Sequence, residues 1–141
     1  MIAAVALLVA SVLPGCWRPP VDAPITRQFV APMCVWCPGH RGIEYRTAAN
    51  AQVSAVAAGR VTFSGVVVGT RYVVVELADG RKVTYGDLAA AAVRRGDRVV
   101  VGRVLGRTTA RLFLGVRVRG IPVDPLPLLC TDRGRVRLVP L

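Results

Sequence analysis

The chain contains a single histidine, and its neighbours decide what chemistry it can perform. His40 lies in the segment Pro38-Gly39-His40-Arg41-Gly42-Ile43-Glu44, in which a carboxylate follows four residues later. The flanking glycines allow a sharp turn and the close approach of another group. Imidazole and carboxylate groups both bind zinc. The pair therefore predicts one half of a metal site, and the alternative is a hydrogen-bonded loop histidine.

Two cysteines precede this histidine and offer a second kind of chemistry. The spacing Cys34-x-x-Cys37-x-x-His40 suits three zinc ligands, and Glu44 would be a fourth. Structural zinc motifs usually come in two paired halves, and only one half is present. A Cys34–Cys37 disulfide, free or otherwise paired thiols, and a metal site all remain open, and Cys130 is a further partner for either loop cysteine.

The N-terminal segment predicts export. Residues 2–13 are apolar apart from Ser11, but the run is shorter than the roughly 20 residues that span a bilayer. It fits the apolar part of a secretory signal. Leu13-Pro14-Gly15-Cys16 resembles a bacterial lipobox, which predicts lipidation of Cys16. Ordinary secretion and an uncleaved apolar anchor are the alternatives. Export also favours oxidised thiols.

Composition limits the classes of partner. The 141 residues are enough for one domain with its own core. A formal net charge of +11 favours anionic partners: nucleic acid, anionic lipid or acidic wall polymers. Aromatic residues make up only 6% of the chain, and few are therefore available to stack on bases. We therefore expect no nucleic-acid partner.

The remaining sequence reads as short β-strands separated by glycine turns. Abundant valine suits a pleated surface, and short, evenly spaced strands indicate an antiparallel sandwich or barrel. The alanine-rich segment Leu88–Val93 is predicted to form one helical turn. The predicted strands are 25–30, 53–57, 60–68, 72–77, 82–85, 99–101, 104–105 and 112–118.

Seven short segments follow one another in a specific order: 39–44, 53–61, 80–88, 93–99, 102–106, 111–117 and 123–126. Together they resemble the lysostaphin-type (LytM-domain) peptidoglycan endopeptidases over about residues 21–129. The resemblance implies an all-β fold, an antiparallel β-sandwich or hybrid barrel of the LytM type. We expect a signal at 1–16, an extended lead-in at 17–24, the LytM-like domain at 25–129 and a basic tail at 130–141.

The resemblance also implies which residues would form the site. In the family, zinc is held by the His and Asp of H-x-x-x-D and by the second His of an H-x-H strand. Here His40 is kept, Glu44 replaces the aspartate and Phe113 occupies the third ligand position. Arg111 and Asp87 replace two histidines that assist the reaction. The chain therefore resembles a catalytically degenerate member, and we expect no cofactor, although active relatives bind zinc.

The sequence thus predicts an exported domain that does not cut peptidoglycan. We expect it to bind peptidoglycan or wall peptides or to regulate a wall hydrolase, and to meet the membrane through a lipid anchor or its apolar N-terminus. One alternative is an active zinc metalloendopeptidase with an atypical site. Another is a lipoyl- or biotinyl-like carrier in which Lys82 is modified, because residues 53–105 also resemble that motif.

A last expectation concerns the charge left behind when zinc is lost. A buried carboxylate without a partner is costly, and a guanidinium fork suits carboxylates. We therefore expect Arg111 to stand in the zinc position and to pair with Glu44, Asp87 or both. The alternative is an Arg111 that points into solvent.

Overall fold

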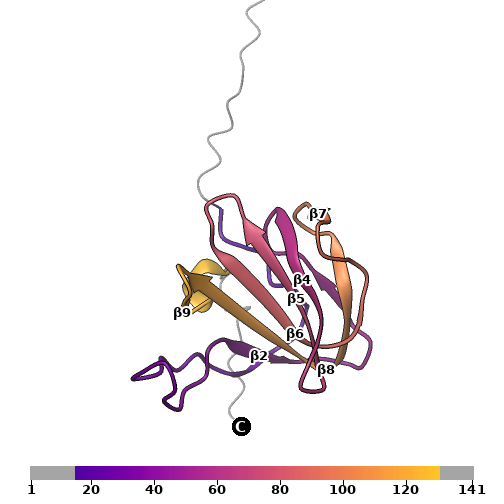
Figure 1. Cartoon of the computed structure of the whole chain (residues 1–141). Coiled ribbons are helices and arrows are strands. Elements are labelled where there is room, and N and C mark those ends of the chain that lie inside the picture. The colour runs from indigo at the N-terminus through magenta and orange to yellow at the C-terminus, as the bar shows by residue number, and fades with distance from the viewer. Residues whose placement is uncertain (1–14, 131–141) are drawn as a thin grey trace, which may run out of the picture.

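The computed structural model describes residues 15–130, which are built on one continuous antiparallel sheet (Figure 1). The strands run in the spatial order β1-β2-β8-β6-β5-β4-β7, and β3 and β9 also pair with β8. The expected all-β antiparallel fold is confirmed. The elements are β1 (Ile25–Arg27), β2 (Ile43–Arg46), β3 (Gln52–Ser54), β4 (Gly59–Val67), β5 (Thr70–Leu77), β6 (Lys82–Ala91), β7 (Arg98–Val99), β8 (Val104–Val118), β9 (Ile121–Val123) and the 3-10 helix η1 (Leu126–Leu128).

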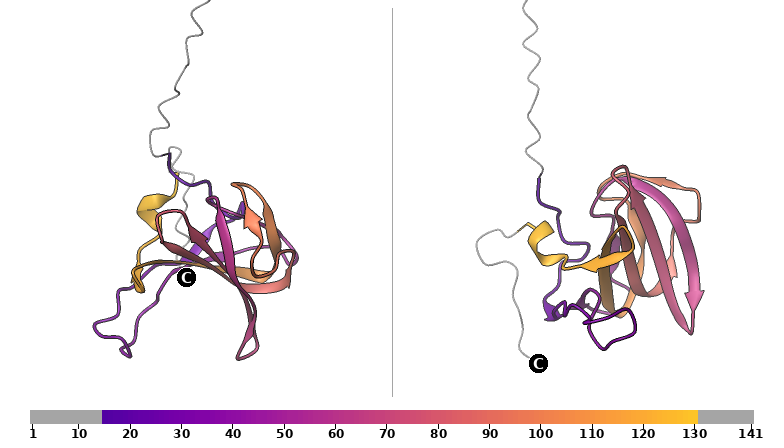
Figure 2. Two further views of the ribbon diagram at one scale, coloured as in Figure 1. Left: turned by 45° about the horizontal axis from the view of Figure 1, so that its top comes forward. Right: turned by 60° about the vertical axis from the view of Figure 1, so that its left-hand side comes forward.

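Strand β8 organises the sheet. It spans 15 residues, and its first part pairs with β3 while its later part pairs with β2 and β9. The register with β6 shifts twice, between Gly86 and Leu88 and between Leu88 and Ala90. Such bulges bend a strand and increase its twist. Figure 2 shows the resulting curvature of the long strands.

The core lies on one face of these strands, as a period of two along each strand requires. Alternating side chains of β2 and β8, Ile43, Tyr45, Leu112 and Leu114, are at most 1% exposed. The residues between them therefore point to the opposite face. This alternation places Glu44, Arg111 and Phe113 together, away from the core.

The predicted helical turn at Leu88–Val93 is wrong. Residues as far as Ala91 continue β6, with Ala90 opposite Arg107 and Ala91 opposite Gly106. A Cβ atom at Gly106 would collide with the carbonyl oxygen of Ala90, so glycine permits this close pairing. Tertiary pairing therefore overrides the helical preference of alanine. The two predicted strands at 104–105 and 112–118 are likewise parts of the single strand β8.

Two disulfides settle the fate of the cysteines. Cys34 pairs with Cys37, as one of the alternatives predicted, and Cys16 pairs with Cys130. The alternative in which Cys130 pairs with a loop cysteine is therefore wrong. The structure also contradicts lipidation of Cys16, because a sulfur in a disulfide cannot carry a thioether-linked lipid. Trp17 lies beside this bond, where its backbone exchanges hydrogen bonds with Leu128 and Cys130.

The rest of the predicted signal, residues 1–14, and the tail at 131–141 lie outside the described residues. Between residues 15 and 130, no helix has the length and apolar character needed to cross a membrane.

Two buried tyrosines provide a test of the core. The backbone N–H of Val56 donates a 2.9 Å hydrogen bond to the Tyr85 hydroxyl, whereas the Tyr45 hydroxyl has no hydrogen-bond partner among the described residues. Burial raises the pKa of both phenols well above the usual range. Tyr85→Phe would leave the Val56 N–H unpaired and should lower the free energy of unfolding by about 1–3 kcal/mol.

Tyr45→Phe serves as the matched control, because it removes a hydroxyl that makes no hydrogen bond with any residue from 15 to 130. Its free energy of unfolding, measured by urea denaturation, should equal or exceed that of the parent. Equal losses in the two variants would contradict this description of the core.

Candidate functional site

The register between β2 and β8 assembles the site. Glu44 lies opposite Phe113, and Arg46 lies opposite Arg111. Residues two apart on a strand share a face, so Arg111 and Phe113 both lie beside Glu44. The sequence predicted this grouping through its family resemblance, and the sheet brings the residues together.

His40 is held at the edge of this group by its own backbone and side chain. Its backbone forms a two-way bridge with Val30, and its Nδ1 lies 2.9 Å from the carbonyl oxygen of Gln28. A carbonyl oxygen only accepts, so Nδ1 carries the donated proton and Nε2 faces Glu44. The Nε2 atom lies 3.7 Å from Glu44 Oε2, and the two side chains are only 11% and 15% exposed. That distance is too long for a hydrogen bond.

The ring of Phe113 is seated among three glycines. A Cβ atom at Gly42 or Gly115 would come within 3.0 Å of the Phe113 ring, and one at Gly86 would lie 3.3 Å from Phe113 Cβ. The ring also meets His40 edge-on, with centroids 5.8 Å apart. An aromatic side chain therefore fills the space beside the histidine, which is a favourable edge-to-face geometry.

Arg111 pairs with one of its two expected partners. Its Nη1 atom lies 3.5 Å from Glu44 Oε1. No ion pair joins Arg111 to Asp87 among the described residues. The Arg111 side chain is 63% exposed, so water screens the pair strongly. The residue that fills the position beside His40 is therefore Phe113, with Arg111 above it at the surface.

Asp87 is placed by a strained turn in β6. It has a φ of 60°, and the register of β6 shifts around it. Its backbone carbonyl accepts a 3.0 Å hydrogen bond from the Thr109 hydroxyl. A positive φ is uncommon outside glycine, although aspartate tolerates it better than most residues. Asp87 thus contributes a fixed backbone position rather than a partner for Arg111.

The zinc expected for active relatives does not suit these residues. Phe113 has no donor atom, and Arg111 presents a permanent positive charge close to Glu44. Among residues 15–130, no three His, Cys, Asp or Glu side chains are close enough to hold a metal ion. The alternative site through Cys34 and Cys37 is wrong as well, because zinc binds thiolates and both sulfurs are in a disulfide.

A groove continues from Phe113 across the same face of the sheet. Its volume is about 460 Å³, and Arg41 and Arg117 supply the positive charge. Arg41 also donates hydrogen bonds to the carbonyl oxygens of Val35 and Cys37, which fixes the disulfide loop beside the groove. The lining residues are Arg41, Phe63, Val67, Tyr72, Val74, Thr84, Phe113, Gly115 and Arg117.

Sequence reasoning missed the groove residues of β4 and β5, among them Phe63 and Tyr72. Their signal in the sequence is faint. In β5 the half-buried Tyr72 and Val74 alternate with the fully buried Val73 and Val75. This pattern reveals a strand with two covered faces, but not that one face adjoins Phe113.

The contacts of Phe113 and Arg111 predict which of two substitutions lowers the free energy of unfolding more. Phe113→Ala removes a partly buried ring and should lower the free energy of unfolding by about 1–3 kcal/mol, less than a fully buried phenylalanine would cost. Arg111→Ala breaks an exposed pair and should cost less than about 1 kcal/mol. Chemical denaturation measures both. A loss for Arg111→Ala as large as that for Phe113→Ala would show that the arginine, and not the ring, stabilises the site.

Comparison with known proteins supports the family suggested by the sequence. The sequence profile of peptidase family M23 matches residues 38–125. No curated protein matches the chain significantly. A zinc-containing peptidase from Vibrio cholerae is 26% identical with a TM-score of 0.68, and the alignment covers 79% of this chain and 40% of that chain.

Two further solved structures share the fold. A chain of the SpoIIIAH and SpoIIQ complex is 20% identical with a TM-score of 0.70, covering 80% of this chain and 99% of that one. The catalytic domain of the antimicrobial peptidase lysostaphin from Staphylococcus simulans is 19% identical with a TM-score of 0.65, covering 75% and 91% respectively. The profile spans more than half of the sequence, and the fold of the chain agrees with these structures. This chain therefore belongs to peptidase family M23.

Proposed function

We propose that this protein is a non-catalytic member of family M23 that binds cell-wall peptidoglycan or its peptides outside the cytoplasm. The observation that carries the proposal is the replacement of metal donors at the centre of the site. Phe113 packs on His40, and Arg111 faces Glu44. Members of the family act on peptidoglycan, and the groove beside Phe113 is the surface that we assign to binding it.

The groove offers complementary chemistry to wall peptides. Such peptides carry free carboxylates, and Arg41 and Arg117 stand along the groove. Guanidinium groups bind carboxylates in a planar, bidentate manner. The aromatic rings of Tyr72 and Phe113 supply apolar surface between them. This combination of a few charged groups and apolar walls is typical of binding sites for small ligands and peptides.

The two disulfides support a location outside the cytoplasm. Cys16–Cys130 and Cys34–Cys37 account for all four cysteines of the chain. Disulfides form and persist in oxidising compartments and are rare in the cytosol of most organisms. An M23 domain fits the same location, because its family's substrate lies there.

A second candidate role, regulation of a wall hydrolase, is favoured by the disulfide loop. Met33, Val35 and Trp36 are 96%, 87% and 87% exposed on this loop, which projects from the body of the sheet (Figure 1). Exposed apolar side chains that lie close together mark interaction sites. The similar chain in the SpoIIIAH and SpoIIQ structure is likewise part of a protein complex.

A sedimentation assay tests the proposed function. The purified protein should pellet with insoluble peptidoglycan and release no soluble wall fragments, with or without added zinc. A Tyr72→Ala/Arg117→Gln variant should bind about tenfold more weakly, because it loses an aromatic contact and a charged hydrogen bond worth together about 1.4 kcal/mol. Arg119→Gln is the control, because Arg119 lies on an exposed turn outside the groove.

Zinc-dependent release of wall fragments that His40→Ala abolishes would contradict the non-catalytic assignment. Equal binding by the groove variant and the Arg119 control would contradict the assignment of the groove. Unchanged wall binding combined with loss of hydrolase regulation in Trp36→Ser would favour the second role.

A further inference from the structure

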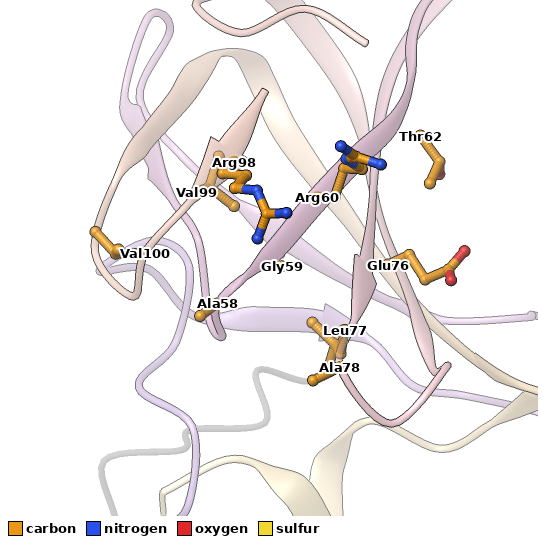
Figure 3. A pocket seen from close by; sticks show the side chains of 10 residues that line it. All are labelled: Ala58, Gly59, Arg60, Thr62, Glu76, Leu77, Ala78, Arg98, Val99 and Val100. Atoms are coloured by element: carbon orange, nitrogen blue, oxygen red, sulfur yellow. The ribbon is translucent and has the colours of Figure 1, made fainter. Parts of the chain in front are cut away.

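A second hollow lies at the other end of the strand order from β2, between β4, β5 and β7 (Figure 3). Its volume is about 700 Å³, which exceeds that of the groove beside Phe113. The residues that line it are Ala58, Gly59, Arg60, Thr62, Glu76, Leu77, Ala78, Arg98, Val99 and Val100. None of them belongs to the site described above, and its chemistry is different.

Two arginines enter this hollow from neighbouring strands. Arg60 on β4 and Arg98 on β7 are direct partners in the antiparallel ladder. Residues paired in this way have Cα atoms about 4.5–5.5 Å apart. Like charges directly opposite each other destabilise a sheet. Both side chains are exposed, and Figure 3 shows both within the same hollow.

No carboxylate among residues 15–130 forms an ion pair with Arg60 or Arg98. Glu76 lies opposite Arg60 on the β5 side and is the only acidic residue between positions 15 and 130 that lines the hollow. Among residues 15–130, no ion pair of 4.0 Å or less joins it to Arg60 or Arg98. In Figure 3 its carboxylate points away from the two guanidinium groups. Asp97 instead accepts a 2.8 Å hydrogen bond from the backbone N–H of Arg94.

Neighbouring residues add a third positive charge and close backbone packing around the hollow. Arg95 lines an adjoining hollow together with Arg60, so a third guanidinium lies nearby. Gly59 permits the close approach of strands beneath them, because a Cβ atom there would collide with the carbonyl oxygen of Glu76. The buried side chains of Leu77 and Val99 form an apolar part of the lining. Both guanidinium groups are exposed, so water and salt screen their attraction for an anion and binding should weaken as the ionic strength rises.

We propose that Arg60 and Arg98 form a binding site for a phosphate group, separate from the groove and its proposed function. The oxygens of a carboxylate lie in one plane. Those of a phosphate or phosphodiester group are arranged tetrahedrally and point in different directions, so that the group can meet two guanidinium forks that approach from different strands. Two guanidinium groups side by side, with no paired acid, match that ligand. The phosphate belongs either to an anionic polymer or to a lipid headgroup.

The test compares a double variant with a matched control. Arg60→Gln/Arg98→Gln removes both charges from the hollow. Arg18→Gln/Arg119→Gln removes the same charge from two exposed arginines that line none of the hollows described here. Binding of both proteins and of the parent is measured at one ionic strength with three probes: soluble poly(glycerol phosphate), phosphatidylglycerol vesicles and polyglutamate.

We expect the Arg60/Arg98 variant to lose about tenfold in affinity for a phosphate-bearing probe relative to the control variant, as expected for about 1.4 kcal/mol of lost binding. Loss confined to poly(glycerol phosphate) assigns the site to a polymer, and loss confined to vesicles assigns it to a lipid. Equal affinities of the two variants for both phosphate probes would overturn the proposal, since the effect would then be one of net charge. An equal loss for polyglutamate would overturn the preference for phosphate.

Discussion

The backbone pairing between β2 and β8 is the constraint on which the site depends. It sets Glu44 opposite Phe113 and turns Ile43 and Leu114 into the core. A shift of one residue would move every side chain to the other face. Packing of the core side chains therefore fixes the strand register, and the register in turn fixes which residues lie on the outer face. The site residues are thus positioned by core residues that take no part in the chemistry of the site.

Within that framework, Phe113 and Arg111 contribute differently to the site. The Phe113 ring takes up the space beside His40, in a seat that three glycines leave open. Arg111 lies closer to water and balances part of the charge of Glu44. The histidine keeps a hydrogen bond from Nδ1 to a backbone carbonyl, an orientation that also suits metal-binding histidines. The strand register and this hydrogen bond thus fix the positions of His40 and Glu44.

Much of the fold could be predicted from the order of the segments between residues 39 and 126 that resemble the family. Such a resemblance contains information on long-range strand pairing that local propensity lacks. Where only propensity was available, it failed at Leu88–Ala91, since pairing with β8 decides that segment. The expected Arg111–Glu44 pair is present. The packing of Phe113 could not be predicted, because two of the three glycines around it, Gly42 and Gly86, lie on other segments of the chain. The Cys16–Cys130 bond joins the two ends of the described chain, and a local lipobox-like motif contains no information on that contact.

The most direct test of the account is the zinc content of the purified protein after dialysis, compared with that of an Arg111→His/Phe113→His variant. We propose that Arg111 and Phe113 are the two residues that prevent metal binding, because His40, Glu44 and the strand register are otherwise in place. The parent should contain no stoichiometric zinc, and the variant should hold about one ion per chain, since three protein ligands suffice for zinc. Stoichiometric zinc in the parent, removed by His40→Ala, would contradict the account.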